Sequence, residues 1–142
     1  MDVYSYDMNK RIELAAPSPE HQKLVGALAK ALREQRGLQL RGVAHDDYED
    51  KPYEIGGFVP DVIAYDEAKE LLVIGEAETC DHIDTEHTRD QIKAWTNRVM
   101  SEGKSKGVSV PVHVIVPSNC KNDLETFLVN LSVRDRVTVW SL

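Results

Sequence analysis

The chain has 142 residues, of which 42% are hydrophobic and 29% charged, a composition expected of one globular domain spanning 1–142. Its formal net charge of −7 argues against a general nucleic-acid coat protein, which needs many cations to neutralise phosphates. The charge is uneven, because residues 37–90 carry 15 acids and 4 bases, whereas residues 1–36 and 91–142 are slightly basic.

The first predicted elements are a helix and a strand. Ser18-Pro19-Glu20 has the pattern of a helix N-terminus, with Ser as N-cap, Pro at the first helical position and an acid in the first turn. Apolar residues then recur at helical spacing through about Gln35, and Gly37 ends the helix. Residues 38–44 are expected to form a strand, and the polar, acidic segment 45–56 is expected to be a loop.

A β-hairpin is predicted next, because residues 57–65 and 71–79 have strand composition and the residues between them, 66–70, allow only a turn. The remaining predicted elements are a helix over about 85–102 with Ile92, Trp95 and Val99 on one face, a flexible basic loop over 103–107, a buried strand over 110–116, a helix over 122–131 and a strand over 137–140. The order α-β-β-β-α-β-α-β predicts an α/β fold with a mixed β-sheet flanked by helices.

Three carboxylates are expected at one end of this hairpin. Alternate residues of a strand share a face, so Asp61 lies on the face of Ile63, and Glu76 and Glu78 lie on the face of Ile74. An antiparallel register that pairs Ile63 with Ile74 also places Asp61 opposite Glu76. Acids at a strand end are often only solubilising groups, but Asp and Glu are disfavoured in strands, and a bound cation relieves their mutual repulsion. Oxygen ligands of this kind favour Mg²⁺ or Mn²⁺.

These residues resemble the motif of the PD-(D/E)xK nuclease superfamily. Pro60-Asp61 is followed after 14 residues by Glu76-Ala77-Glu78, and the segment 75–79 is similar to the Gly-Glu-Ala-Lys-Thr form of the motif. The resemblance implies a restriction-endonuclease-like αβββαβ core over about residues 18–116. It also implies that Asp61, Glu76 and the backbone carbonyl of Ala77 hold Mg²⁺ (or Mn²⁺).

Two helical positions extend the resemblance. Some branches of the superfamily carry a Glu on the first helix that reaches the metal directly or through water, and the spacing of Glu20 from Leu24 predicts that Glu20 faces inward. Branches similar to resolvases carry Gln-x-x-x-Tyr on the helix after the motif, which Gln91 and Trp95 resemble. A surface position for Gln91 remains an open alternative, and packing in the core is the favoured interpretation of Trp95.

Glu78 stands where the superfamily has lysine. That lysine is thought to position or activate the attacking water and to stabilise negative charge on the phosphate, and a carboxylate supplies no such cation. Glu78 is expected instead to bind a second metal or to accept a proton from water. Lys51 is an unconstrained candidate for a displaced lysine, whereas Lys93 is a poor one because it lies about 200° around the helix from Gln91.

The function implied by the resemblance is Mg²⁺-dependent phosphodiester hydrolysis of DNA by an endonuclease. One alternative is a catalytically inactive nuclease-fold module that acts as a structural or nucleic-acid-associated dimer. Another is an acidic protein-interaction domain, in which the three carboxyls would fan apart. The short chain and the small basic surplus outside 37–90 predict a homodimer that binds DNA weakly and with the help of metal. The acidic segment 46–54 has no explanation in this scheme.

A cytoplasmic protein with reduced thiols is expected. No apolar run of about 18 residues predicts a membrane span, and the N-terminal residues lack the apolar centre of a signal peptide. Cys80 and Cys120 lie far apart and form no Cys-x-x-Cys motif.

Overall fold

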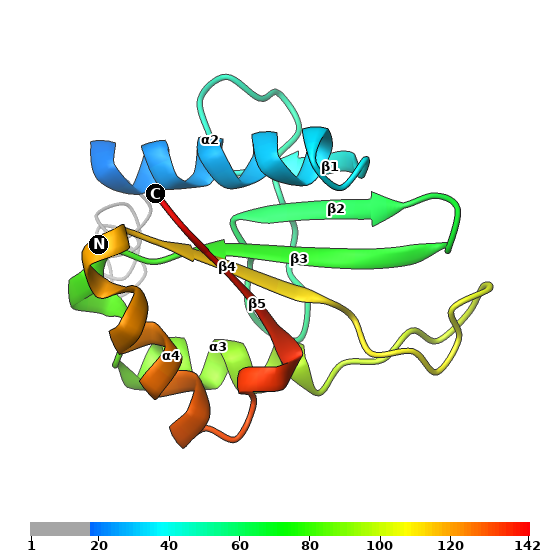
Figure 1. The fold of residues 1–142 in the computed structure, drawn as a ribbon. Helices are drawn as coiled ribbons and strands as arrows, with labels where there is room; N and C mark the ends of the chain where they lie inside the picture. The colour runs from blue at the N-terminus through cyan, green and yellow to red at the C-terminus, as the bar shows by residue number, and fades with distance from the viewer. Residues whose placement is uncertain (1–17) are drawn as a thin grey trace, which may run out of the picture.

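A mixed β-sheet forms the centre of the structure, a computed structural model that describes residues 18–142. The strands in chain order are β1 (Gln39–Val43), β2 (Val62–Asp66), β3 (Leu71–Ala77), β4 (Val112–Val116) and β5 (Val137–Ser141). They lie side by side in this same order, with β1, β2 and β3 antiparallel and β4 and β5 added in parallel (Figure 1). The predicted order of elements and the α/β fold class are confirmed.

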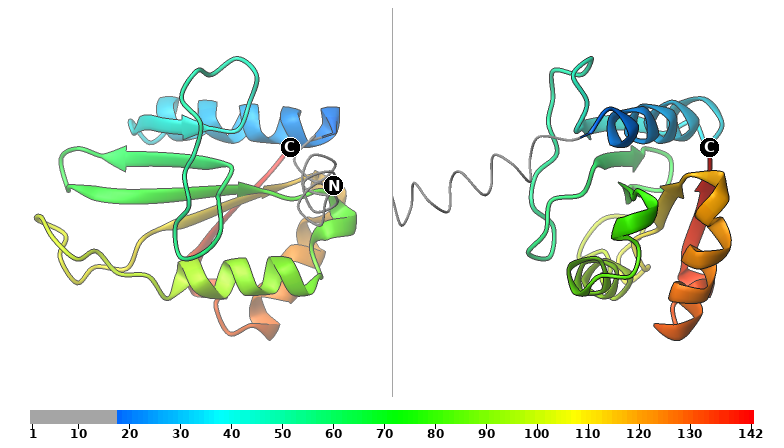
Figure 2. Two further views of the ribbon diagram at one scale, coloured as in Figure 1. Left: turned by 180° about the vertical axis from the view of Figure 1, so that it is seen from behind. Right: turned by 90° about the vertical axis from the view of Figure 1, so that its left-hand side faces the viewer.

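Helices cover both faces of the sheet. Helix α2 (Pro19–Glu34) packs on one face, and α3 (Glu86–Thr96) and α4 (Lys121–Asn130) pack on the other (Figures 1 and 2). Each face therefore has its own apolar core, one built around the buried leucines of α2 and the other around Trp95 and the inward residues of β4. Among residues 18–142, no helix is long and apolar enough to cross a membrane.

The β2–β3 hairpin has the predicted register, with Ile63 opposite Ile74. Its first strand is shorter than predicted, since β2 begins at Val62 rather than at residue 57. Gly56 and Gly57 have φ angles of 65° and 94°, so they form a turn that the extended backbone of a strand excludes. Residues 57–61 consequently reach the sheet as a loop, and Asp61 is the last residue of that loop.

The predicted helix over 85–102 is also too long, because α3 ends at Thr96. The residues that follow pair with a returning segment instead, through bonds from Met100 N to Val108 O (2.9 Å) and from Val110 N to Arg98 O (2.9 Å). Val99 is therefore 53% exposed on this two-stranded arm and does not extend the apolar face of the helix. The backbone pairing of the arm competes with helix formation and replaces it.

The basic loop over 103–107 makes hydrogen bonds to the β2–β3 hairpin. The Ser105 hydroxyl donates to the Lys69 carbonyl at 2.6 Å, and the Lys104 N–H donates to Glu70 Oε1 at 3.0 Å. The tip of the arm is thereby bonded to the turn of the β2–β3 hairpin.

Cys80 and Cys120 form a disulfide, so the expectation of reduced thiols is wrong. The two residues are 40 positions apart in sequence, but they follow β3 and β4, which are neighbouring parallel strands. Their Cα atoms are 5.7 Å apart, within the range that a disulfide spans.

Candidate metal centre

Three carboxyl groups converge where β2 begins and β3 ends, as the sequence predicts. Asp61 directly precedes β2, Glu76 lies in β3, and Glu78 directly follows β3. The Asp61 N–H donates to Glu76 Oε1 at 3.1 Å, and the Ala77 N–H donates to Asp61 Oδ2 at 2.9 Å. The Glu78 N–H donates to Ile115 O at 3.0 Å, which continues the pairing of β3 with β4 past the end of the strand.

The carboxyl groups repel each other in surroundings that are nearly closed to solvent. Glu76 and Glu78 are only 6% and 7% exposed. Burial, together with the charges of Asp61 and Glu78, raises the pKa of Glu76 well above its ordinary value. Burial and the charge of Asp61 raise the pKa of Glu78 to about 8. The charges of Asp61 and Glu78 act on Glu76, and the charge of Asp61 acts on Glu78, so the three groups lie close together and do not fan apart.

A histidine that the sequence analysis missed completes this cluster. Nε2 of His21, in α2, lies 3.2 Å from Asp61 Oδ2. The hydrogen bond with Asp61 raises the pKa of His21 against the effect of burial. The other ring nitrogen, Nδ1, is buried without a hydrogen-bond partner among residues 18–142.

Glu20 does not face inward, which corrects its predicted orientation. The buried residues of α2 are Leu24, Val25, Leu28, Ala29 and Leu32. The centre of this stripe lies nearer to Val25 and Leu28 than to Leu24, and His21 stands four residues before Val25 and seven before Leu28. The stripe therefore turns His21 toward the sheet and leaves Glu20 exposed. This helical spacing is the signal by which His21 was predictable.

Helix α3 supplies two polar side chains to the same face of the sheet. The Thr88 hydroxyl lies 3.4 Å from Glu78 Oε2, and its bond lowers the pKa of that carboxyl against the larger effect of burial. Gln91, one turn further along, is 5% exposed, and its Oε1 is buried without a partner among residues 18–142. The surface alternative for Gln91 is thus wrong. Trp95 is fully buried in the core, where its Nε1 donates to Ile55 O at 2.8 Å.

Neither lysine considered as a replacement for the missing motif lysine is available at the cluster. Lys51 Nζ donates to the carbonyls of His45 and Tyr48, at 2.7 and 2.6 Å, and so closes its own loop. Lys93 is on the exposed side of α3. In the described part of the chain, the positive group bonded to this carboxylate cluster is the imidazole of His21 when it is protonated.

The donor atoms of the cluster fit a divalent cation. Carboxylate and carbonyl oxygens suit Mg²⁺ and Mn²⁺, and the buried carboxyls with raised pKa would gain most from a positive charge. The side chains are engaged in bonds with one another, however, and no group of three His, Cys, Asp or Glu residues within 18–142 is already arranged to hold a metal ion. Oδ2 of Asp61 makes both of these bonds, to His21 Nε2 and to the Ala77 N–H.

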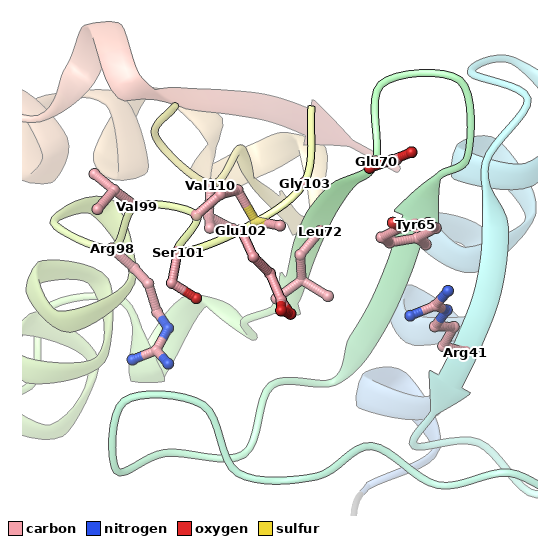
Figure 3. A pocket seen from close by; sticks show the side chains of 11 residues that line it. Arg41, Tyr65, Glu70, Leu72, Arg98, Val99, Ser101, Glu102, Gly103 and Val110 are labelled. Atoms are coloured by element: carbon pink, nitrogen blue, oxygen red, sulfur yellow. The ribbon is translucent and has the colours of Figure 1, made fainter. Parts of the chain in front are cut away.

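A cleft of about 470 Å³ lies at the opposite, turn end of the hairpin, between the arm and strands β1–β3 (Figure 3). The Arg41 guanidinium stacks 3.8 Å from the centre of the Tyr65 ring on one wall, and Arg98 lies on the other. Glu70 and Glu102 also line this cleft, so its charges are mixed. It shares no residue with the carboxylate cluster.

No protein-family model, no curated protein and no solved structure matches this chain. The fold and the site therefore define an α/β protein with a buried carboxylate cluster at one end of a mixed sheet, and its function has to be argued from that cluster.

Proposed function

We propose that this protein is a divalent-metal-dependent nuclease of the PD-(D/E)xK kind, which hydrolyses phosphodiester bonds in DNA. The observation that carries the proposal is the convergence of Asp61, Glu76 and Glu78 in a nearly solvent-free position. Three acids buried together repel one another and so oppose folding of the metal-free protein. A bound cation would cancel this repulsion, which would explain why the acids lie here.

The residues that would hold the cation are Asp61, Glu76 and the Ala77 carbonyl, with Mg²⁺ or Mn²⁺ as the expected ion. When bound, such an ion supplies Lewis-acid stabilisation of a phosphate and makes water more acidic. Glu20, being exposed, is assigned at most an indirect role through water.

The remaining polar groups would act on the proton and the phosphate. A positive charge in the cluster lowers the pKa of Glu78 again, which leaves a carboxylate able to accept a proton from water. The Gln91 amide, buried with a free Oε1, would orient the attacking water or the phosphate. His21 would supply the hydrogen bond and positive charge that the motif lysine provides elsewhere.

DNA as the substrate and a homodimer as the working form remain part of the proposal. A phosphate backbone near the cluster would meet a net acidic protein, so we expect weak association that falls with added salt.

The test combines Mn²⁺ titration calorimetry with nicking of supercoiled plasmid in Mg²⁺ or Mn²⁺. We expect the parent to bind and to nick, and Asp61→Ala to lose about 100-fold or more in both measurements. Glu67→Ala is the matched control, since it removes an exposed carboxylate from the turn of the same hairpin. Equal nicking by the parent and Asp61→Ala would contradict the proposal.

A catalytically inactive module is the second candidate, and the absence of lysine at position 78 favours it. This candidate predicts that the parent binds Mn²⁺ without nicking DNA and that Glu78→Lys restores nicking. A parent that nicks DNA, with Glu78→Lys less active than the parent, would exclude it.

A further inference from the structure

The disulfide lies directly beside the carboxylate cluster. Cys80 begins the 3₁₀ helix η1 (Cys80–His82), two residues after Glu78, and Cys120 ends the 3₁₀ helix η2 (Ser118–Cys120). Because β3 and β4 are parallel neighbours, the disulfide joins the two segments that leave the sheet at the edge where Glu78 lies. The covalent bond therefore anchors the chain immediately after the third carboxylate.

The two cysteine residues differ in their exposure to solvent. Cys120 is only 2% exposed, whereas Cys80 is exposed and lines a cleft of about 630 Å³ between the start of α3 and α4. Ile83, Phe127 and Leu131 give this cleft apolar walls, and the Arg89–Asp84 ion pair lies at its rim. A thiol in solution consequently meets Cys80 at the surface, while Cys120 lies within the apolar core.

The segment that the disulfide anchors also bonds to Glu78. The Thr88 hydroxyl donates to the His82 carbonyl at 2.7 Å and lies 3.4 Å from Glu78 Oε2, so η1, the start of α3 and the carboxylate share one hydrogen-bonding group. Apart from Ile83, which is buried, residues 80–84 are exposed. Without the disulfide, this segment depends on a few hydrogen bonds and one apolar side chain.

We propose that Cys80 is a site of thiol–disulfide exchange and that reduction of the Cys80–Cys120 bond loosens residues 79–88 and weakens divalent-cation binding at the carboxylate cluster. The effect on cation binding rests on the proposed function, whereas the exchange site does not. A thiolate of a small dithiol attacks Cys80 Sγ, the protein S–S bond breaks, and Cys120 leaves as a thiolate. The second thiol of the reductant then attacks the mixed disulfide and releases the Cys80 thiolate. Two protein thiols and one oxidised reductant result.

The exchange site is tested on the oxidised chain with glutathione, a monothiol, followed by acid quench and peptide mass spectrometry. We expect the mixed disulfide on Cys80 in about tenfold excess over Cys120. An equal distribution, or an excess on Cys120, overturns the assignment of Cys80. Hydrogen exchange measured on the oxidised and the fully reduced chain is expected to rise about tenfold in residues 79–88 and to stay unchanged in α2. Unchanged exchange in residues 79–88 overturns the loosening.

Coupling to the cluster is tested by Mn²⁺ titration of the oxidised chain and of the chain reduced with a phosphine that is removed before titration. We expect about tenfold weaker binding after reduction. The Cys80→Ser/Cys120→Ser variant is expected to match the reduced chain and to ignore reductant. Equal Mn²⁺ affinity in the two states overturns the coupling and leaves the proposed function standing. Absence of Mn²⁺ binding in both states overturns the proposed function and the coupling together, while the glutathione result still decides the exchange site.

Discussion

Both ends of the β2–β3 hairpin carry carboxylate side chains, but their surroundings differ. At the turn end, Asp66 Oδ1 accepts the Lys69 N–H at 3.1 Å and Glu70 Oε1 accepts the Lys104 N–H, so these acids stabilise the turn and the arm docked on it. At the open end, Glu76 and Glu78 are buried together beside Asp61, and their raised pKa values show that their charged forms oppose folding.

The acids at the turn end stabilise the fold through single hydrogen bonds, whereas the acids at the open end repel one another. Solvent and single N–H donors satisfy the acids of the turn at little cost. The cluster at the open end is nearly closed to solvent and has one imidazole for three acids. Its repulsion is relieved by protonation, which the raised pKa values of Glu76 and Glu78 favour, and in the proposed function by a bound cation.

The largest expected effect is a loss of stability with rising pH in chelator. Since folding raises the pKa of Glu78 from an ordinary value of 4.5 to about 8, its stabilising contribution is complete below about pH 4.5 and is lost as the pH rises through 8. The loss attributable to Glu78 is on the order of 4 kcal/mol between about pH 5 and pH 8.5. Urea unfolding of the parent and of Glu78→Gln measures it, and the variant should show a much flatter profile.

The control for this experiment is Glu67→Gln at the turn, which should keep the pH dependence of the parent. The parent must be compared with a variant because His113 also makes stability depend on pH. Burial lowers the pKa of His113 to about 4, so the stabilising contribution of neutral His113 is lost as the pH falls below 6.5. If the parent and Glu78→Gln had parallel pH profiles, the two ends of the hairpin would not differ as described. Millimolar Mn²⁺ should restore stability to the parent at the higher pH.

A smaller effect is expected where the open end packs against α2. A Cβ added at Gly75, next to Glu76, would lie 2.9 Å from Leu28 Cδ2 and 3.1 Å from Val62 Cβ. Gly75→Ala should therefore cost about 1–3 kcal/mol of unfolding free energy through overpacking, measured in urea. Gly75→Ala made in a Leu28→Ala background should lower the unfolding free energy clearly less. An equal loss in both backgrounds would show that the contact with Leu28 does not cause the destabilisation. Because α2 carries His21, we also expect weaker Mn²⁺ binding in Gly75→Ala.

The smallest effect is expected at the turn end. Ser105→Ala removes the hydroxyl that donates to Lys69 O and leaves that carbonyl unpaired, at a cost of about 1 kcal/mol in urea unfolding. Mn²⁺ affinity should not change, since Ser105 belongs to the arm and the turn. Ser101→Ala, at an exposed position of the same arm, is the control and should be neutral. A change in Mn²⁺ affinity in Ser105→Ala would mean that the two ends are coupled.

Much of the fold was predictable because its determinants are local. The cap at Ser18, the four-residue connection after β2 and the apolar run of β4 each specify an element within a few residues. The alternation of residues between the two faces of each strand and the length of the turn together specify the register of the hairpin. A shift of the strand pairing by one residue would turn Ile63 and Ile74 to the other face. Convergence of the three carboxylates follows from that register.

The errors concern competition between segments distant in sequence. Helix α3 stops at Thr96 because residues 98–100 pair with residues 108–110, and local helix propensity carries no information on that pairing. The loop over 103–107 is likewise bonded to residues more than thirty positions away, which its own sequence does not indicate.

The sequence by itself determined the order of the elements, the pairing of β2 with β3 and the meeting of Asp61, Glu76 and Glu78, because periodicity and turn length act over short distances. Only the tertiary structure decided that the inward-facing His21 reaches Asp61, that Gln91 is buried with a free Oε1, and that Cys80 is bonded to Cys120. The physical reason is that these contacts depend on the rotation of a helix about its axis and on which strands become neighbours. Both are settled by packing of the two apolar cores against the sheet.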